Sequence, residues 1–177
     1  GGAGAPSGSV PLGGASGPGR FERDTRGGQS SGDPRMVGAK AVNHIGIAVR
    51  SLADQRPFYE GVLGARFEGE EEVADQRVKV AFYALGSETE PVRLELLEPT
   101  SDDSPIAKFI EKKGEGMHHV AYTVDGIEDR LRALKGDGVR LIDETPRDGA
   151  HGARIAFLHP KASNGVLTEL CEPGGRH

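Results

Sequence analysis

The sequence predicts an α+β fold, in which two paired βαβββ units form a curved mixed sheet around a metal site. Two observations predict this fold. A glycine-rich opening segment lacks the apolar residues that a core needs, so the fold lies in the remainder of the chain. That remainder contains an internal repeat, which predicts two copies of one structural unit.

The opening segment is predicted to be a disordered Gly/Pro-rich tail over residues 1–36. Residues 1–35 contain 11 of the 27 glycines and 4 of the 11 prolines of the chain. Their large apolar residues are only Val10, Leu12 and Phe21. Such a segment cannot bury enough surface to offset the entropy lost on ordering. We therefore expect one compact domain over residues 40–173.

The composition disfavours several classes of partner. The formal net charge is -5, with no basic patch of the kind that nucleic acid requires. The longest apolar run, residues 80–85, is too short to span a bilayer. Cys171 is the only cysteine, so no intrachain disulfide can form, which fits a reducing compartment. We expect a cytoplasmic protein, or a mitochondrial matrix protein if the source is eukaryotic.

The internal repeat has a nearly constant offset. Residues 43–49 (NHIGIAV) match 118–124 (HHVAYTV), and 80–82 match 155–157, both at an offset of 75. Near the end of each copy, LELLEP at 94–99 matches TELCEP at 168–173, at an offset of 74. These matches predict a first unit at 40–99, a linker at 100–116 and a second unit at 117–173.

The elements of the first unit are predicted from alternating apolar residues and from the positions of glycine and proline. Residues 43–49 alternate as a half-buried strand. A helix follows and ends at Gly64, which suits a left-handed position. With Asp54 as its cap, the helix begins near Gln55 and Pro57 falls in the first turn, where no N–H is needed. Three further strands are predicted at 65–73, 77–85 and 91–98.

The elements of the linker and the second unit are predicted in the same way. Ser104 and Pro105 predict a short capped helix inside the linker. The second unit then has a strand at 117–124 and a helix at 126–136 that ends near Gly138. Its last three strands are predicted at 139–143, 152–158 and 165–171.

The repeat places two histidines and two glutamates at equivalent positions. His44 and His119 begin equivalent strands, and Glu95 and Glu169 lie on equivalent last strands. Singly, each has an ordinary interpretation, as a hydrogen-bonded histidine or a solvent-facing glutamate. Together, at His-to-Glu gaps of 51 and 50 residues, they form a set of two nitrogens and two oxygens that suits a divalent metal. His151, in a loop, either touches a substrate or is solvated.

Longer stretches carry a family resemblance. NHIGIAV (43–49), FYEGVLG (58–64), the segment 94–122 and FLHPKASNGVLTEL (157–170) resemble the vicinal oxygen chelate superfamily and, within it, the methylmalonyl-CoA epimerase family. The resemblance covers nearly all of 40–173 and implies metal ligands at His44, Glu95, His119 and Glu169. It favours cobalt, with manganese, zinc or nickel as alternatives.

The resemblance also implies a reaction. Members of the family interconvert (2R)- and (2S)-methylmalonyl-CoA by proton transfer at C2, through an enolate that the metal stabilises. Glu169 is the expected catalytic base, with Glu95 as a candidate for the second. Some members carry another glutamate on a strand of the first unit, where this chain has Val80. A water held by Gln76 and, with less support, Lys79 are further candidates for the second group.

The expected partner is an acyl-CoA, whose phosphates need cationic contacts. Lys161 and Arg154 are the candidates for these contacts, with weaker support for three lysines of the linker helix, at Lys108, Lys112 and Lys113. We expect a homodimer. The alternatives are a glyoxalase I-like isomerase, an extradiol dioxygenase of the same fold, and a metal-free module that sequesters a small molecule.

Overall fold

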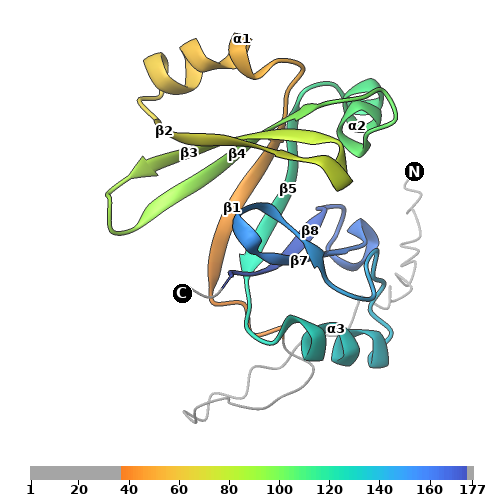
Figure 1. The fold of residues 1–177 in the computed structure, drawn as a ribbon. Helices are drawn as coiled ribbons and strands as arrows, with labels where there is room; N and C mark the ends of the chain where they lie inside the picture. The colour runs from red at the N-terminus through yellow and green to blue at the C-terminus, as the bar shows by residue number, and fades with distance from the viewer. Residues whose placement is uncertain (1–36, 175–177) are drawn as a thin grey trace, which may run out of the picture. The chain divides into compact units, whose positions relative to one another are not determined.

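The protein is represented by a computed structural model that describes residues 37–174, so the predicted tail at 1–36 lies outside the described residues. These residues form one sheet of eight strands in the order β2-β3-β4-β1-β5-β8-β7-β6. The sheet is curled, and α1 and α3 lie outside it (Figure 1). No helix among residues 37–174 has both the length and the apolar character needed to cross a membrane.

The first half of the chain supplies one side of the sheet. Its elements are β1 (Ala41–Ala48), α1 (Leu52–Arg56) with a π-helical continuation (Pro57–Val62), β2 (Arg66–Val73), β3 (Val78–Gly86) and β4 (Pro91–Pro99). The linker forms α2 (Pro105–Lys113), capped by the Ser104 hydroxyl as predicted. A short 3-10 turn (Ala74–Gln76) joins β2 to β3.

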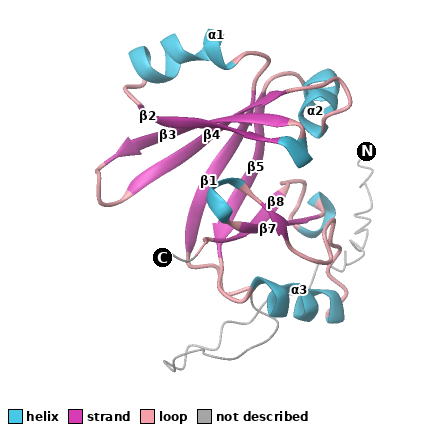
Figure 2. Cartoon of the chain, in the orientation of Figure 1, coloured by secondary structure: helices cyan, strands magenta, loops and turns pink. Residues whose placement is uncertain are grey.

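The second half repeats this order. Its elements are β5 (Gly116–Thr123), α3 (Ile127–Gly136), β6 (Arg147–Asp148), β7 (Arg154–Leu158) and β8 (Thr168–Glu172). Two 3-10 turns, Ala150–Gly152 and Pro160–Ala162, precede and follow β7. Figure 2 shows α1 and α3 on opposite sides of the sheet in this view.

The strand directions confirm the predicted α+β fold with two paired βαβββ units. In the first half β1 runs parallel to β4, and in the second β5 runs parallel to β8. The two halves join where β1 and β5 pair antiparallel at the centre of the sheet. The exact unit boundaries at 40–99 and 117–173 stay our proposal for where each unit begins and ends.

The first helix differs from the prediction. It begins at Leu52 rather than near Gln55, because the hydroxyl of Ser51, not Asp54, caps it by accepting from the Asp54 N–H. Pro57 therefore lies within a continuous helical run. The run changes there from α-helical to π-helical hydrogen bonding, as in the bond from Leu63 N to the Phe58 carbonyl at 2.9 Å. The wider turn accommodates a proline that has no N–H to donate.

The predicted strand at 139–143 was also wrong. This segment contributes only an isolated bridge between Leu141 and Leu158, and the paired strand β6 lies later, at Arg147–Asp148. The backbone N–H groups of Ile142 and Asp143 both donate to one carbonyl, that of Phe157, so no regular ladder forms. Alternating apolar residues cannot distinguish such a turning segment from a short edge strand.

Each outer helix is anchored to the last strand of its own half by a glutamate. Glu98 at the end of β4 accepts from the Leu52 N–H at 2.6 Å, and Glu172 at the end of β8 accepts from the Gly126 N–H at 2.5 Å. A carboxylate at a helix N-terminus satisfies a free N–H and complements the helix dipole. These two glutamates occupy equivalent positions of the repeat.

The hydrophobic residues divide between the two faces of the sheet. On the outer face, α1 packs through Leu52 against β3 and β4, and α3 packs through Leu131 and Leu134 against β7 and β8. Two further hydrophobic clusters lie on the inner, concave face of the sheet, and α2 covers one of them through Ile106 and Ile110. The candidate ligands therefore lie on the inner face.

The central strands approach each other closely at one point. Gly46 on β1 faces His119 on β5, and a Cβ added at Gly46 would lie 2.1 Å from the Cε1 atom of the His119 ring. The equivalent contact in the other direction pairs Ala121 with His44. Position 46 therefore has no room for even one methyl group.

Gly46→Ala is predicted to lower the free energy of unfolding by about 1 to 3 kcal/mol, because the added methyl group must displace the His119 ring. Chemical denaturation measures the change. Gly136→Ala serves as the control, since nothing lies within 4 Å of the Cβ it would add in α3. The control should gain stability by about 0.5 kcal/mol. Equal effects of the two substitutions would contradict the close contact.

Candidate metal centre

Two rows of side chains run across the sheet, and each ends in a histidine. In the first row, Phe82 pairs with Glu95, Glu95 with Gly46, and Gly46 with His119. The second row is built in the same way, and its members are Phe157, Glu169, Ala121 and His44. In both rows the phenylalanine, the glutamate and the small residue come from one half, and the histidine comes from the other. The predicted ligands are therefore brought to the junction of the two halves.

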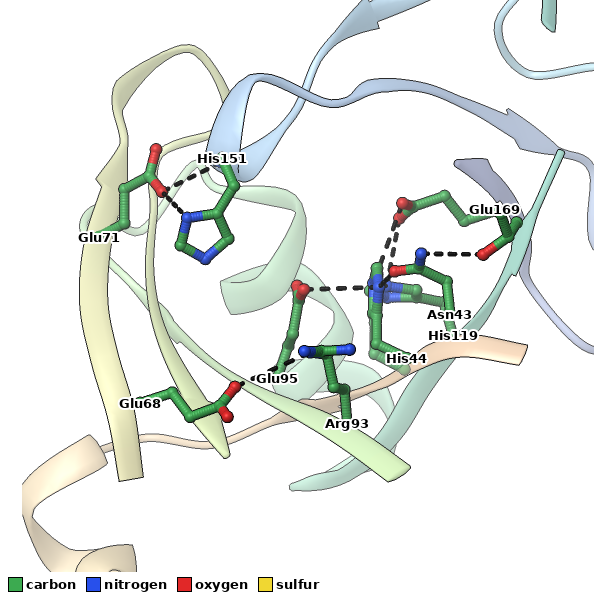
Figure 3. Close-up of polar contacts among 11 residues, drawn as sticks. Asn43, His44, Glu68, Glu71, Arg93, Glu95, His119, His151 and Glu169 are labelled. Atoms are coloured by element: carbon green, nitrogen blue, oxygen red, sulfur yellow. Dashed lines mark hydrogen bonds and ion pairs between the residues drawn. The ribbon is translucent and has the colours of Figure 1, made fainter. Parts of the chain in front are cut away.

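Three of the four predicted ligands converge on one point. The Nε2 atoms of His44 and His119 are 3.0 Å apart. Glu169 Oε2 lies 3.2 Å from Nε2 of His119, and its Oε1 lies 3.9 Å from Nε2 of His44. All three side chains are buried, and one ligand atom from each lies within 4.8 Å of the others (Figure 3).

Glu95 stands beside this cluster rather than in it. Its Oε1 lies 3.4 Å from Nδ1 of His44, on the side of the ring away from the Nε2 atom. Burial, with smaller contributions from the carboxylates of Glu169 and Glu71, raises the pKa of Glu95 to about 8. In the absence of a bound cation, Glu95 is therefore mostly protonated at neutral pH.

The residue before each histidine orients its ring. Asn43 Oδ1 lies 2.8 Å from Nδ1 of His44, while the Asn43 amide donates to Thr123. His118 Nδ1 lies 3.0 Å from Nδ1 of His119. Asn43 and His118 are equivalent in the repeat. If each accepts the Nδ1 proton of the histidine that follows it, both Nε2 lone pairs are directed to the centre.

This donor set fits a divalent cation. Burial lowers the pKa of His44 to about 4, a change that the Glu169 carboxylate partly opposes, so the imidazole is neutral at pH 7. Burial also lowers the pKa of His118 to about 4. The two imidazoles bring their Nε2 atoms within 3.0 Å of each other beside the buried Glu169 side chain, so their lone pairs repel unless a proton or a cation lies between them. Imidazole and carboxylate are common ligands of divalent first-row metals.

The cluster opens into a cavity of about 770 Å³, a size that suits a small-molecule ligand. Apolar residues of β3 and β4 line one wall, and residues of β7 and β8 line the other. Three arginines reach the cavity, and each pairs with a carboxylate: Arg77 with Asp103, Arg93 with Glu68 and Arg147 with Asp143.

The two predicted phosphate-binding residues lie apart from this cavity. Lys161 is in the 3-10 turn after β7, beside a smaller hollow of about 300 Å³ whose lining includes Pro160, His118 and His119. Among residues 37–174, no ion-pair partner of Lys161 is found. Arg154 on β7 is paired with Glu128 of α3 at 2.5 Å. Lys161 is therefore the more available cation of the two.

Some residues of the site were not identified from the sequence. The role of Asn43 and His118 as ring acceptors, and the need for glycine at position 46, depend on the pairing of β1 with β5. The repeat did contain a signal, because each acceptor directly precedes a predicted ligand. Arg93 and Arg147 carried no signal, since their distance from the site depends on the curvature of the sheet.

Comparison with known sequences identifies the family. Residues 43–157 match the model of the glyoxalase/bleomycin resistance protein/dioxygenase superfamily. The chain is 52% identical over 134 residues to the uncharacterised protein YqjC of Bacillus subtilis, covering 76% of this chain and 93% of that protein. It is 41% identical over 130 residues to the mitochondrial methylmalonyl-CoA epimerase of Homo sapiens, covering 73% of this chain and 72% of that protein.

Comparison with solved structures agrees with the comparison of sequences. A variant of the Streptomyces coelicolor methylmalonyl-CoA epimerase in complex with 2-nitronate-propionyl-CoA superposes with a TM-score of 0.72 at 36% identity, covering 77% of this chain and 96% of that one. A methylmalonyl-CoA epimerase in complex with methylmalonyl-CoA and NH4+ gives the same TM-score, identity and coverage.

Glu95 is predicted to make the metal-free protein less stable as the pH rises. Its folded pKa of about 8 is above its unfolded value of 4.5, so the folded state holds a proton that the unfolded state has lost. Below pH 6.5 the lowered pKa values of His44 and His118 act in the opposite direction, so the effect of Glu95 is seen between pH 6.5 and about 8.

In this window the free energy of unfolding should fall by about 2 kcal/mol. Denaturation with a chelator present, at several pH values, measures the fall. Glu95→Gln should abolish it, because glutamine does not titrate. Identical pH profiles for the two proteins would show that Glu95 ionises normally.

Proposed function

Since the chain belongs to the glyoxalase/bleomycin resistance protein/dioxygenase superfamily, we propose that it is a methylmalonyl-CoA epimerase, which interconverts (2R)- and (2S)-methylmalonyl-CoA. One observation carries the proposal: the buried cluster of His44, His119 and Glu169 opens into a cavity large enough for an acyl group. The fold and the named relatives support this reaction over others of the superfamily.

His44, His119 and Glu169 would hold a divalent ion, and Glu95, which now faces Nδ1 of His44, would become the fourth ligand after losing its proton and turning toward the Nε2 atoms. Cobalt is the favoured ion, and manganese, zinc or nickel would suit the same ligand types. When bound, such an ion acts as a Lewis acid toward the substrate oxygens and stabilises the negative charge of an enolate. The pairs Asn43–His44 and His118–His119 fix the rings that face it.

The protein groups would move the proton. The C2 hydrogen of methylmalonyl-CoA lies between a thioester and a carboxylate, so its loss gives a delocalised enolate. Glu169 is buried on β8 and faces the cavity, which suits it to remove this proton from one face of C2. Inversion then requires a proton to arrive at the opposite face.

Acyl-CoA binding would use the cations around the two hollows. We propose that Lys161 contacts a CoA phosphate, since it lies beside the smaller hollow, which shares His118, His119 and Leu167 with the main cavity. Arg154 is the second candidate and would first have to leave Glu128. For the assembly of the chain we keep the expectation of a homodimer.

The alternatives within the superfamily differ in what they require. An extradiol dioxygenase would use His44, His119 and Glu169 as a facial triad and keep other metal positions open for oxygen. Glu95, beside His44 in the same cavity, disfavours that arrangement. A glyoxalase I-like isomerase remains the rival enzyme, and a metal-free binding module has no need for the buried cluster.

Incubation of metal-loaded protein with (2R)- or (2S)-methylmalonyl-CoA in D2O should introduce deuterium at C2 and bring both epimers to the same final ratio. Mass spectrometry and chiral analysis of the thioester measure both changes. Glu169→Gln and protein treated with EDTA should each lose at least about 100-fold in rate. Absence of exchange from both epimers would refute the proposed function.

Lys161→Ala should raise KM for methylmalonyl-CoA by about tenfold with little change in kcat, because a phosphate contact far from C2 contributes equally to ground state and transition state. Arg154→Ala should raise KM less, since Arg154 already has a carboxylate partner. Steady-state kinetics measure both, and Arg132→Ala on the exposed face of α3 is the control. A fall in kcat with unchanged KM would contradict a phosphate contact.

A further inference from the structure

Inversion at C2 needs proton-transfer groups on two faces, and Glu169 accounts for one. On the opposite wall of the cavity, β3 presents Val80 and Phe82, neither of which can carry a proton. We propose that His151 is the second acid/base and that Glu71 positions it. The proposal rests on the proposed epimerase function.

His151 reaches this wall from the other half of the chain. It lies in the 3-10 turn between β6 and β7, and its ring centroid is 4.2 Å from that of Phe82 on β3. Phe82 pairs with Glu95 across the sheet, so the imidazole lies over the side chain next to the candidate ligand. Both His151 and Phe82 line the main cavity.

Glu71 holds the imidazole from behind. Its Oε2 lies 3.6 Å from Nδ1 of His151 and accepts the His151 backbone N–H at 3.2 Å. On β2, Glu71 pairs with Val80 of β3, so the residue beside it offers no competing donor. Because the Glu71 carboxylate faces Nδ1, Nε2 is the ring nitrogen left to exchange a proton with a substrate. Figure 3 shows the ring between the Glu71 carboxylate and the centre of the site.

The turn is built to present this side chain. His151 has a φ of 53°, in the left-handed region that favours glycine, and Gly152 follows it with a φ of 68°. A non-glycine residue in that conformation is strained, and such strain is found at functional sites. The Gln76 amide donates to the Asp148 carbonyl at 3.4 Å and ties the start of this loop to the first half.

His151 and Glu169 act from opposite sides. Glu169 pairs with Phe157 of the second half, whereas His151 covers Phe82, the equivalent phenylalanine of the first half. In Figure 3 the two side chains approach from opposite sides, with the Glu95 carboxylate between them. A substrate whose C2 lies in this space would have one group facing each side of that carbon.

The proton balance follows. The Glu169 carboxylate takes the C2 proton, and the C–H electron pair enters the enolate. The His151 imidazolium then gives its Nε2 proton to the other face of C2, where the new C–H bond forms. Glu169 is left protonated and His151 neutral. Before the next turnover in the same direction, Glu169 passes its proton to water in the cavity, and His151, whose side chain is 68% exposed, takes a proton from water; the reverse reaction uses the two groups in the opposite order.

The test measures solvent exchange separately for each epimer in D2O, using metal-loaded protein. His151→Phe retains a ring over Phe82 but carries no proton. Epimerisation should fall by about 100- to 1,000-fold. The epimer whose C2 hydrogen faces Glu169 should still take up deuterium without inversion, while the other epimer should lose exchange. Metal content and melting temperature, measured in parallel, should match those of the wild type.

Glu71→Gln should lower epimerisation by about tenfold with the same preference for one epimer, since glutamine stabilises the imidazolium less. Glu72→Gln is the matched control. Glu72 is exposed and lies opposite Lys79 in the β2–β3 register, whereas Glu71 lies opposite Val80. Wild-type epimerisation by His151→Phe, or equal loss of exchange from both epimers, would overturn the role of His151. If the wild-type protein exchanges neither epimer, the proposed function itself fails, so the two failures are distinguishable.

Discussion

The antiparallel contact between β1 and β5 places every candidate ligand. In that contact Gly46 faces His119 and Ala121 faces His44, so the two rings fit only because the residues opposite them are small. The parallel partners β4 and β8 then place a glutamate beside each small residue. A shift of one residue in this register would turn over one half relative to the other, so that one histidine and the glutamate of its own half would face the side where α1 and α3 pack.

Without a bound cation, the electrostatic interactions at this junction destabilise the folded protein. Two imidazoles present Nε2 atoms to each other at 3.0 Å, and the partly buried Glu95 keeps its proton at neutral pH because desolvation disfavours its charged form. The surrounding polar groups, Asn43 and His118, hold the rings in this arrangement. The site is thus organised before any cation arrives, and its cost is offset by packing elsewhere in the sheet.

Much of the candidate site could be predicted from the sequence, because the repeat links pairs of equivalent residues. His44 with His119, and Glu95 with Glu169, could be matched by offset alone, and three of these four do converge. The offset could not reveal that Glu95 faces Nδ1 rather than Nε2 of His44, since this depends on side-chain torsions. The offset also failed at 139–143, where the halves differ. Pro57 was expected in the first turn of the helix, but it lies where a π-helical turn begins. The contact of His151 with Phe82 could not be inferred from the offset either, because it joins a loop of the second half to a strand of the first.

The rows across the sheet also have a consequence for folding. Each contains residues from both halves of the chain, so neither half can form the centre by itself. The joining strands are far apart in sequence, which makes their pairing a late, long-range step. A cation held by His44 and His119 would then act as a noncovalent cross-link between the halves, because it binds only after they have paired. Resistance to partial opening of the sheet would follow the availability of the ion.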